Sequence, residues 1–185
     1  MKKALYSFIY YRLLGWKTNV TVPDLDKYVI CAAPHTSNLD LFIGKLFYGA
    51  IGRKTSFMMK KEWFFFPLGL IFKAVGGIPV DRKHKTSLVE QMAEQFARSK
   101  QFHLAITPEG TRKCNPNWKK GFYYIALKAQ VPIVLIGIDY PSKTISATKM
   151  ITPSGDIDKD MREIKLYFKN FKGKYPENFS IGKVE

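Results

Sequence analysis

The sequence predicts an α/β protein with a mixed, largely parallel central sheet flanked by helices. Two observations support this fold class. Apolar, β-branched runs of strand length alternate along the chain with stretches in which apolar residues recur at helical spacing. With 185 residues, 46% of them hydrophobic and 24% charged, the chain also has the length and composition of a folded protein with one core. We therefore expect a single domain over residues 1–185.

The first segment, at about residues 1–16, is predicted to be a short amphipathic helix. Its apolar side chains recur at helical spacing beside Lys2, Lys3 and Arg12, and they are Leu5, Phe8, Ile9, Leu13 and Trp16. An aromatic, basic helix of this kind is typical of segments that lie in a membrane interface. A helix that packs on its own domain explains the pattern equally well.

Strands and helices are then expected in alternation. Buried, β-branched runs predict strands at 28–33, 55–59, 77–80, 102–107 and 132–138. Helical periodicity predicts helices at 40–51, 86–100, 118–130 and 156–168. The first of these helices follows a Ser37-Asn38 capping pair, and the second has Ser87 and Glu90 at capping-box spacing.

Charge and aromatic content narrow the class of partner. The net charge of +15 favours a negatively charged partner, which can be nucleic acid, an anionic membrane face or an acidic carrier protein. Aromatic residues make up 15% of the chain, and many lie near Lys or Arg, as at a bilayer interface. The apolar run 63–72 has about half the ~20 residues that a spanning helix needs, and Pro67 divides it. We expect a protein that lies on a membrane without crossing it.

Cysteine usage and the start of the chain indicate the compartment. Cys31 and Cys114 are far apart and belong to no metal-spaced cluster, which predicts a reducing compartment and no structural metal. No signal peptide is visible, because Arg12 interrupts the first apolar stretch. We therefore expect a cytoplasmic location.

Three polar segments follow predicted strands, where sites of α/β folds collect. The first contains His35 and Asp40, and an Asp in the first turn of a helix can hold one ring nitrogen of a preceding His so that the other accepts a proton. The second segment is Thr107 to Lys113. In it, Gly110 lets the backbone approach a ligand, Thr111 provides a hydroxyl, and Arg112 can bind a phosphate or carboxylate through its planar guanidinium. Taken alone, each of these two segments is explained better by an ordinary structural histidine or turn.

The third segment has the same character, and its two adjoining glycines, Gly76 and Gly77, permit close packing. Its strand ends in Asp81 and Arg82, and Asp81 can orient Arg82 toward an anion.

Together and in this order, the segments resemble the motifs of the glycerolipid acyltransferase family, which includes the 1-acylglycerol-3-phosphate acyltransferases. The family's His-x4-Asp motif is matched by His35 and Asp40. The other matches are Gly77, Ile78 and Arg82; Pro108 to Arg112; Val131 to Ile133; and Lys60 to Trp63 with Pro67 and Gly69. The similarity covers about residues 29–139. Pro34 and Thr107 depart from the family pattern, and the N-terminal region is shorter than in typical lysophosphatidate acyltransferases.

The resemblance implies a glycerol-3-phosphate acyltransferase-like fold and transfer of a fatty acyl group from acyl-CoA or acyl carrier protein to a lipid acceptor at the cytoplasmic face of a membrane. His35 would be the general base and Asp40 its partner, and no cofactor or metal is expected. The substrate-binding candidates are Lys60, Lys61, Arg82, Glu109, Gly110, Thr111 and Arg112.

The acceptor is left open by the residues. The first expectation is 1-acylglycerol-3-phosphate, and an amino-acid-based lyso-lipid is the alternative. A basic nucleic-acid-binding domain is a more distant hypothesis, since no helix-turn-helix, zinc-finger or RNP-type motif is present.

Overall fold

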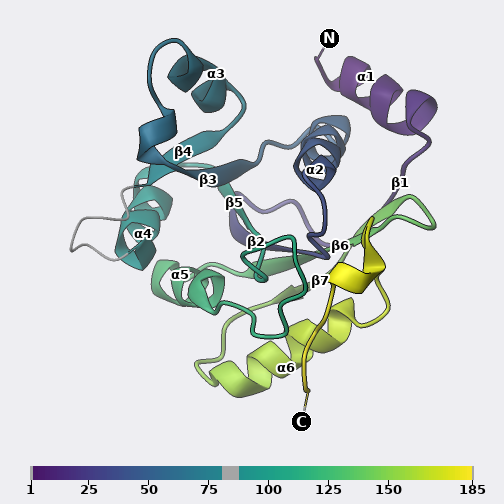
Figure 1. The fold of residues 1–185 in the computed structure, drawn as a ribbon. Coiled ribbons are helices and arrows are strands. Elements are labelled where there is room, and N and C mark those ends of the chain that lie inside the picture. Colours follow the sequence, from purple (N-terminus) through teal and green to yellow (C-terminus); the bar gives the residue numbers. More distant parts are fainter. Residues whose placement is uncertain (1, 81–87, 185) are drawn as a thin grey trace.

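The central sheet of the protein is mixed and mostly parallel. The computed structural model describes residues 2–80 and 88–184, and within these ranges seven strands form one sheet in the order β1-β7-β6-β2-β5-β3-β4 (Figure 1). Only the pair β6 and β7 is antiparallel among them. The strands are β1 Lys17–Val20, β2 Lys27–Ala33, β3 Ser56–Lys60, β4 Gly77–Val80, β5 Phe102–Ile106, β6 Ile133–Asp139 and β7 Thr144–Ile151. The predicted fold class is confirmed.

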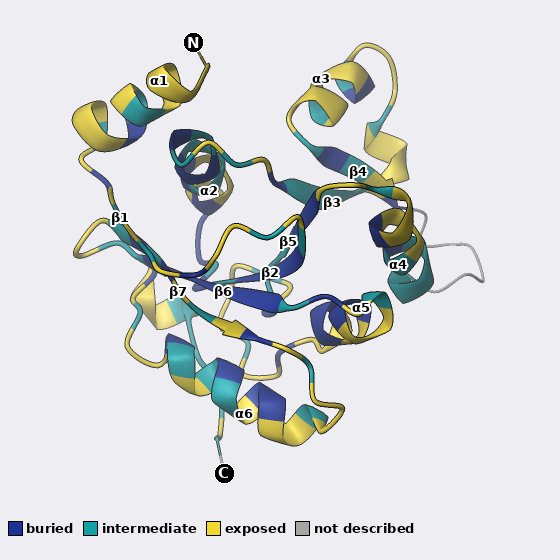
Figure 2. Cartoon of the chain, turned by 180° about the vertical axis from the view of Figure 1, so that it is seen from behind, coloured by how far each residue is buried: buried dark blue, intermediate teal, exposed yellow. Residues whose placement is uncertain are grey.

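Helices cover both faces of this sheet. One face carries α1 and α2, and the other carries α4, α5 and α6 (Figures 1 and 2). The helices are α1 Lys2–Ser7, α2 Leu39–Ala50, α3 Leu68–Ala74, α4 Leu88–Arg98, α5 Gly121–Ala129 and α6 Ile157–Phe168. Short helical turns are η1 Phe8–Leu13, η2 Lys61–Trp63 and η3 Pro176–Asn178.

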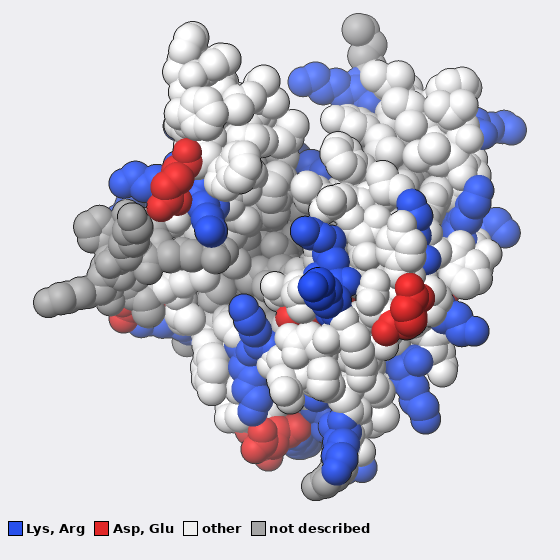
Figure 3. Space-filling view, in the orientation of Figure 1, with Lys and Arg blue, Asp and Glu red and all other residues white. Residues whose placement is uncertain are grey.

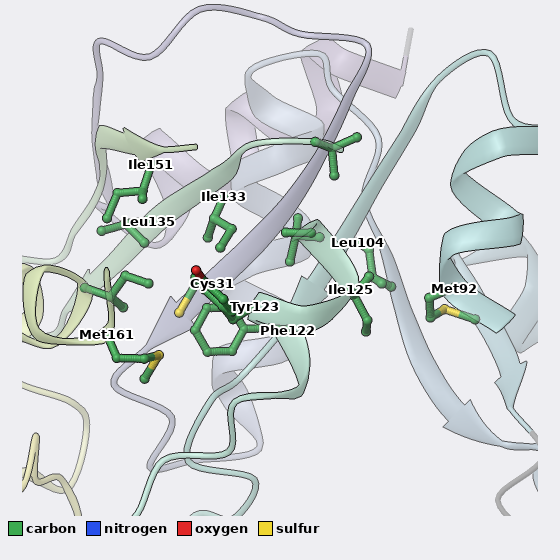
Figure 4. Close-up of a cluster of buried hydrophobic side chains, with 14 of the residues drawn as sticks. Cys31, Met92, Leu104, Phe122, Tyr123, Ile125, Ile133, Leu135, Ile151 and Met161 are labelled. Carbon is green, nitrogen blue, oxygen red and sulfur yellow. The ribbon is translucent and has the colours of Figure 1, made fainter. Parts of the chain in front are cut away.

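Strand β2 lies at the centre because both of its faces are apolar. Successive side chains of a strand point to opposite faces, so Tyr28 and Ile30 pack toward α2 while Val29 and Cys31 pack toward α5. Figure 4 shows the cluster of buried apolar side chains on the α5 side of the sheet, in which Cys31 lies among Leu104, Tyr123 and Leu135. Cys31 is a buried core residue.

The predicted elements are present with several corrections. The N-terminal helix is α1 continued by the π-helical turn η1, and it ends before Trp16, which is buried in the core rather than on the helix. Helix α2 begins as expected, but the Asn38 side chain makes no capping bond, and Ser37 Oγ accepts the Leu39 N–H instead. The helix predicted from residue 118 begins at Gly121. Ser87, the first residue of the predicted capping box, lies outside the described residues.

Strands β3 and β5 part early. They pair only at Ser56 with Leu104 and Phe57 with Ala105, whereas β3 pairs with β4 as far as Lys60. The hydrogen bonds between β3 and β5 therefore end at Phe57, although β3 continues to Lys60. Beyond this point, β3, β4 and α3 form an arm beside the carboxyl end of β5 (Figure 1).

Candidate active site

His35 and Asp40 form a hydrogen-bonded pair at the carboxyl end of the central strand. His35 follows β2, and Asp40 lies in the first turn of α2. The Nδ1 atom of His35 is 3.0 Å from Oδ2 of Asp40. The imidazole is 18% exposed, whereas the carboxylate is only 3% exposed. A carboxylate bonded to Nδ1 fixes the ring tautomer and leaves Nε2 as the nitrogen that can take up a proton.

The buried carboxylate of Asp40 is held from four directions. Besides His35, its Oδ2 accepts the main-chain N–H groups of Thr36 and Ser37, both at 2.9 Å. Its other oxygen, Oδ1, accepts the hydroxyl of Tyr140 at 2.6 Å. A buried charge is tolerated when its lone pairs are satisfied in this way. The arrangement fixes both Asp40 and the loop from residue 35 to 37.

Glu109 lies behind His35. It follows β5, the neighbour of β2, and both of its carboxylate oxygens accept the main-chain N–H of His35, at 3.1 and 3.0 Å. Burial raises the pKa of Glu109 to about 7, and the nearby charge of Asp40 adds to the rise, although the bond from His35 opposes it. Glu109 thus ties the loop after β5 to the loop after β2.

The loop after Glu109 lies beside His35, and both line the same cavity. Gly110 has a φ of +67°, a backbone conformation that favours glycine, and a Cβ there would also displace the end of the Lys119 side chain, 2.9 Å away. Asn115 holds this loop, because its Nδ2 donates to the carbonyl of Glu109 at 2.8 Å. Thr111 Oγ1 accepts the N–H of Lys113 at 3.2 Å.

A cavity of about 890 Å³ adjoins the pair formed by His35 and Asp40, which we call the dyad. His35, Gly110, Thr111, Arg112 and Lys119 line its polar part. Its apolar lining comes from α2 and α5, which cover opposite faces of the sheet, and from the strands between them, and it includes Ile30, Ala32, Phe42, Phe57, Ala105, Ile106, Phe122 and Ile136. Residues of β3 and β5 border it where the two strands part. This combination suits a ligand with a long apolar chain and an anionic or polar head.

Lys45 on α2 also lines this cavity, although the sequence reasoning passed over it. Its Nζ donates to the carbonyl of Thr55 at 2.7 Å and lies 5.9 Å from the centre of the Phe57 ring. Burial lowers the pKa of Lys45.

Two of the remaining predicted site residues lie away from the cavity. Lys60 ends β3 and Lys61 begins η2, and both are exposed and are not among the residues that line the cavity. Arg82 lies outside the described residues.

Tyr140 was not predicted as a site residue. It follows β6 just as His35 follows β2, so the rule that sites gather at strand ends would have drawn attention to it. Over residues 2–80 and 88–184, no group of three or more His, Cys, Asp or Glu side chains is arranged to hold a metal ion.

Comparison with known proteins identifies the family of the chain. A profile of the family described as "Acyltransferase" matches residues 17–139, about two thirds of the chain. The chain belongs to the acyltransferase family. The match spans the sheet from β1 to the end of β6, and it includes His35, Asp40 and Glu109.

Curated relatives of this acyltransferase include plant and human proteins named 1-acyl-sn-glycerol-3-phosphate acyltransferase. The chain is 32% identical to one from Limnanthes alba over 114 residues, which is 58% of the chain and 40% of the relative. It is 35% identical to one from Cocos nucifera over 107 residues, 54% and 33% of the two chains. It is 34% identical to the beta protein of Homo sapiens over 104 residues, 53% and 37%. These alignments span well under half of each relative.

A solved structure has the same fold. The 1-acyl-sn-glycerophosphate acyltransferase PlsC from Thermotoga maritima aligns with a TM-score of 0.63 over 90% of this acyltransferase and 76% of PlsC, at 17% identity. That likeness shows the fold of the sheet and its helices. Among the described helices of the acyltransferase, none combines the length and the apolar character needed to cross a bilayer.

Proposed function

We propose that this acyltransferase moves a fatty acyl group from a thioester donor, acyl-CoA or acyl carrier protein, to a lysophospholipid-type acceptor, in the first place 1-acylglycerol-3-phosphate. The observation that carries the proposal is the bond between His35 Nδ1 and Asp40 Oδ2 beside a large, mostly apolar cavity. The names of the relatives support the choice of acceptor.

In the proposed reaction, His35 Nε2 removes the proton of the acceptor hydroxyl as that oxygen attacks the thioester carbonyl. The Asp40 carboxylate stabilises the imidazolium that forms. When the carbon–sulfur bond breaks, the same imidazolium returns its proton to the departing thiolate. Atoms and charge balance without a covalent acyl-enzyme.

The other site residues have binding or positioning parts in this proposal. Arg112 and Lys119 bring positive charge to the polar end of the cavity, which suits an acceptor phosphate. Glu109 holds the main chain of His35 rather than substrate, since both of its oxygens face that N–H. Lys60, Lys61 and Arg82 stay candidates for a headgroup or the donor's phosphates.

A membrane surface is the proposed setting. Exposed apolar side chains gather on α1 with η1, on the start of α2 and around α3, and they include Leu5, Phe8, Leu13, Leu41, Phe42, Trp63, Phe65, Phe66, Leu70 and Ile71. In Figures 1 and 2, α1 and α3 lie toward the same side of the molecule. Figure 3 shows two mostly uncharged lobes there, with Lys and Arg set around and below them. Apolar insertion beside basic side chains favours an anionic lipid surface.

The function is tested with purified protein, both classes of thioester donor and a panel of lysolipid acceptors that includes an amino-acid-based lyso-lipid. Mass spectrometry identifies the acylated product. We expect 1-acylglycerol-3-phosphate to be acylated and His35→Ala to be inactive although folded. Acylation of the amino-acid-based lyso-lipid alone would show that it, and not 1-acylglycerol-3-phosphate, is the acceptor. Equal rates for His35→Ala and the parent would refute the assignment of His35 as the base. Binding to anionic vesicles but not to nucleic acid at moderate salt would dismiss the nucleic-acid hypothesis.

A further inference from the structure

Tyr140 reaches the dyad from a distant part of the chain. It follows β6, and its hydroxyl donates to Asp40 Oδ1 across 100 positions of sequence. We propose that Tyr140 is a positioning residue, which holds the second oxygen of Asp40 and so fixes the carboxylate against His35. This inference rests on the proposed function of the dyad.

The two oxygens of Asp40 are held differently. Oδ2 accepts three bonds, from His35 Nδ1 and from the N–H groups of Thr36 and Ser37. Among the described residues, Tyr140 is the donor that reaches Oδ1. The Cβ–Cγ torsion of a carboxylate is broad, and rotation about it moves both oxygens together. The bond at Oδ1 adds to the restraint that the three bonds at Oδ2 place on this rotation, and so it helps to keep the direction in which His35 is held.

Tyr140 is itself held in place. Its ring packs edge-to-face on Trp16 with 5.1 Å between ring centres, and its N–H donates to the carbonyl of Lys172 at 2.9 Å. Burial, then the bond to Asp40 and the charge of Asp40, raise the pKa of Tyr140, and Tyr175 adds to the rise. The hydroxyl therefore keeps its proton and remains a donor. Its position is set by three segments: the chain after η1, the end of β6 and the segment before η3.

The same chain offers a matched pair of residues away from the cavity. Tyr123 on α5 donates to Asp160 on α6 at 2.9 Å, and Asp160 also accepts two bonds from Ser154. Neither Tyr123 nor Asp160 lines the cavity. Removing the Tyr123 hydroxyl thus deletes the same kind of bond without touching the dyad.

The first test compares Tyr140→Phe with Tyr123→Phe. Phenylalanine keeps each ring and deletes each hydroxyl. We expect kcat of Tyr140→Phe to fall about 10- to 100-fold with KM nearly unchanged, as for a small misplacement of a reacting group. Tyr123→Phe should keep the parent kcat and lower Tm by at least as much as Tyr140→Phe. A parent-like kcat for Tyr140→Phe, or an equal loss in both variants, would refute the positioning role.

A double-mutant cycle with Asp40→Asn tests whether Tyr140 acts through Asp40. If it does, adding Tyr140→Phe to Asp40→Asn should change kcat less than about twofold. A full further loss in the double variant would mean that Tyr140 acts by another route and would overturn the proposal.

A spectroscopic readout keeps this inference separate from the proposed function. With ¹⁵N-labelled histidine, the Nδ1 proton of His35 is identified by its loss in His35→Gln. We expect its resonance to move or broaden in Tyr140→Phe and to stay unchanged in Tyr123→Phe. Failure of the parent to acylate any acceptor would contradict the proposed function alone, whereas an unchanged resonance in Tyr140→Phe would contradict the positioning role alone.

Discussion

Glu109→Gln should make the stability of the protein less dependent on pH. In the folded protein, burial raises the pKa of Glu109 to about 7 from an ordinary value of 4.5. Between these two values, the folded state binds a proton that the unfolded state has released, so the free energy of unfolding falls as pH rises. The contribution of Glu109 is complete below about pH 4.5 and is lost as pH passes 7.

The size of this effect follows from the two pKa values. Because one pKa unit corresponds to about 1.36 kcal/mol, raising the pH from 5 to 8 costs the folded parent about 2.5 kcal/mol through Glu109. For a chain of 185 residues this is about 6 °C in Tm. The glutamine that replaces Glu109 does not titrate, and it keeps a carbonyl that can accept the His35 N–H. The free energy of unfolding of the variant should therefore not fall by this amount between pH 5 and pH 8.

Thermal unfolding of the parent and of Glu109→Gln at pH 5 and pH 8 provides the measurement. The parent should lose more Tm between the two pH values, by about 6 °C relative to the variant. Titrating groups that do not interact with Glu109 act on both proteins alike and cancel in the difference. The reasoning would be refuted if the parent and the variant declined in parallel.

Three further predictions concern the dyad, the core and the membrane face. Asp40→Asn should remain folded by circular dichroism yet lose about 10²- to 10⁴-fold in kcat, through loss of tautomer control, and parent-like turnover would remove Asp40 from the mechanism. Gly137→Ala should lower the free energy of unfolding by about 1–3 kcal/mol in urea titrations, because a Cβ at Gly137 would overlap the Phe171 ring, and unchanged stability would contradict that contact. Phe66→Ser with Leu70→Ser should weaken binding to anionic vesicles at least about tenfold at constant Tm, since these side chains are 83% and 62% exposed. The control Leu166→Ser, on α6, should bind like the parent, and equal weakening in both would move the contact away from α3.

Much of the fold could be predicted because its signals are local. The alternation of apolar runs and helical periodicity located β2 to β6 with α2, α4, α5 and α6, to within a few residues. Helix α6 is the clearest case, since Asp156 caps it by accepting the Lys159 N–H. Strand β7 was missed although its burial alternates between inward and outward residues for much of its length. Strand β1 also alternates, between exposed and partly buried residues, but over only four residues.

The site could be predicted in part for a geometric reason. The carboxyl ends of parallel strands meet at one edge of a sheet, so segments after β2 and β5 were expected to converge, and His35 and Glu109 are indeed in contact. That Glu109 holds the main chain of His35 depends on strand order and register, which no local pattern encodes. Tyr140 gives a weaker signal, because it also follows a strand but a lone tyrosine there has no characteristic spacing.

The segment before η3 completes the loop that carries His35, and this has a consequence for synthesis of the chain. The N–H of Tyr175 donates to Thr36 Oγ1 at 3.2 Å across 139 positions, and Lys172 holds Tyr140 through its carbonyl. A ribosome makes the His35 loop early and these partners late, at about 5–20 residues per second. The nascent chain therefore carries His35 and Asp40 for many seconds before Tyr140 and Tyr175 can hold them. The proposed dyad should reach its final geometry only after residue 175 has been made.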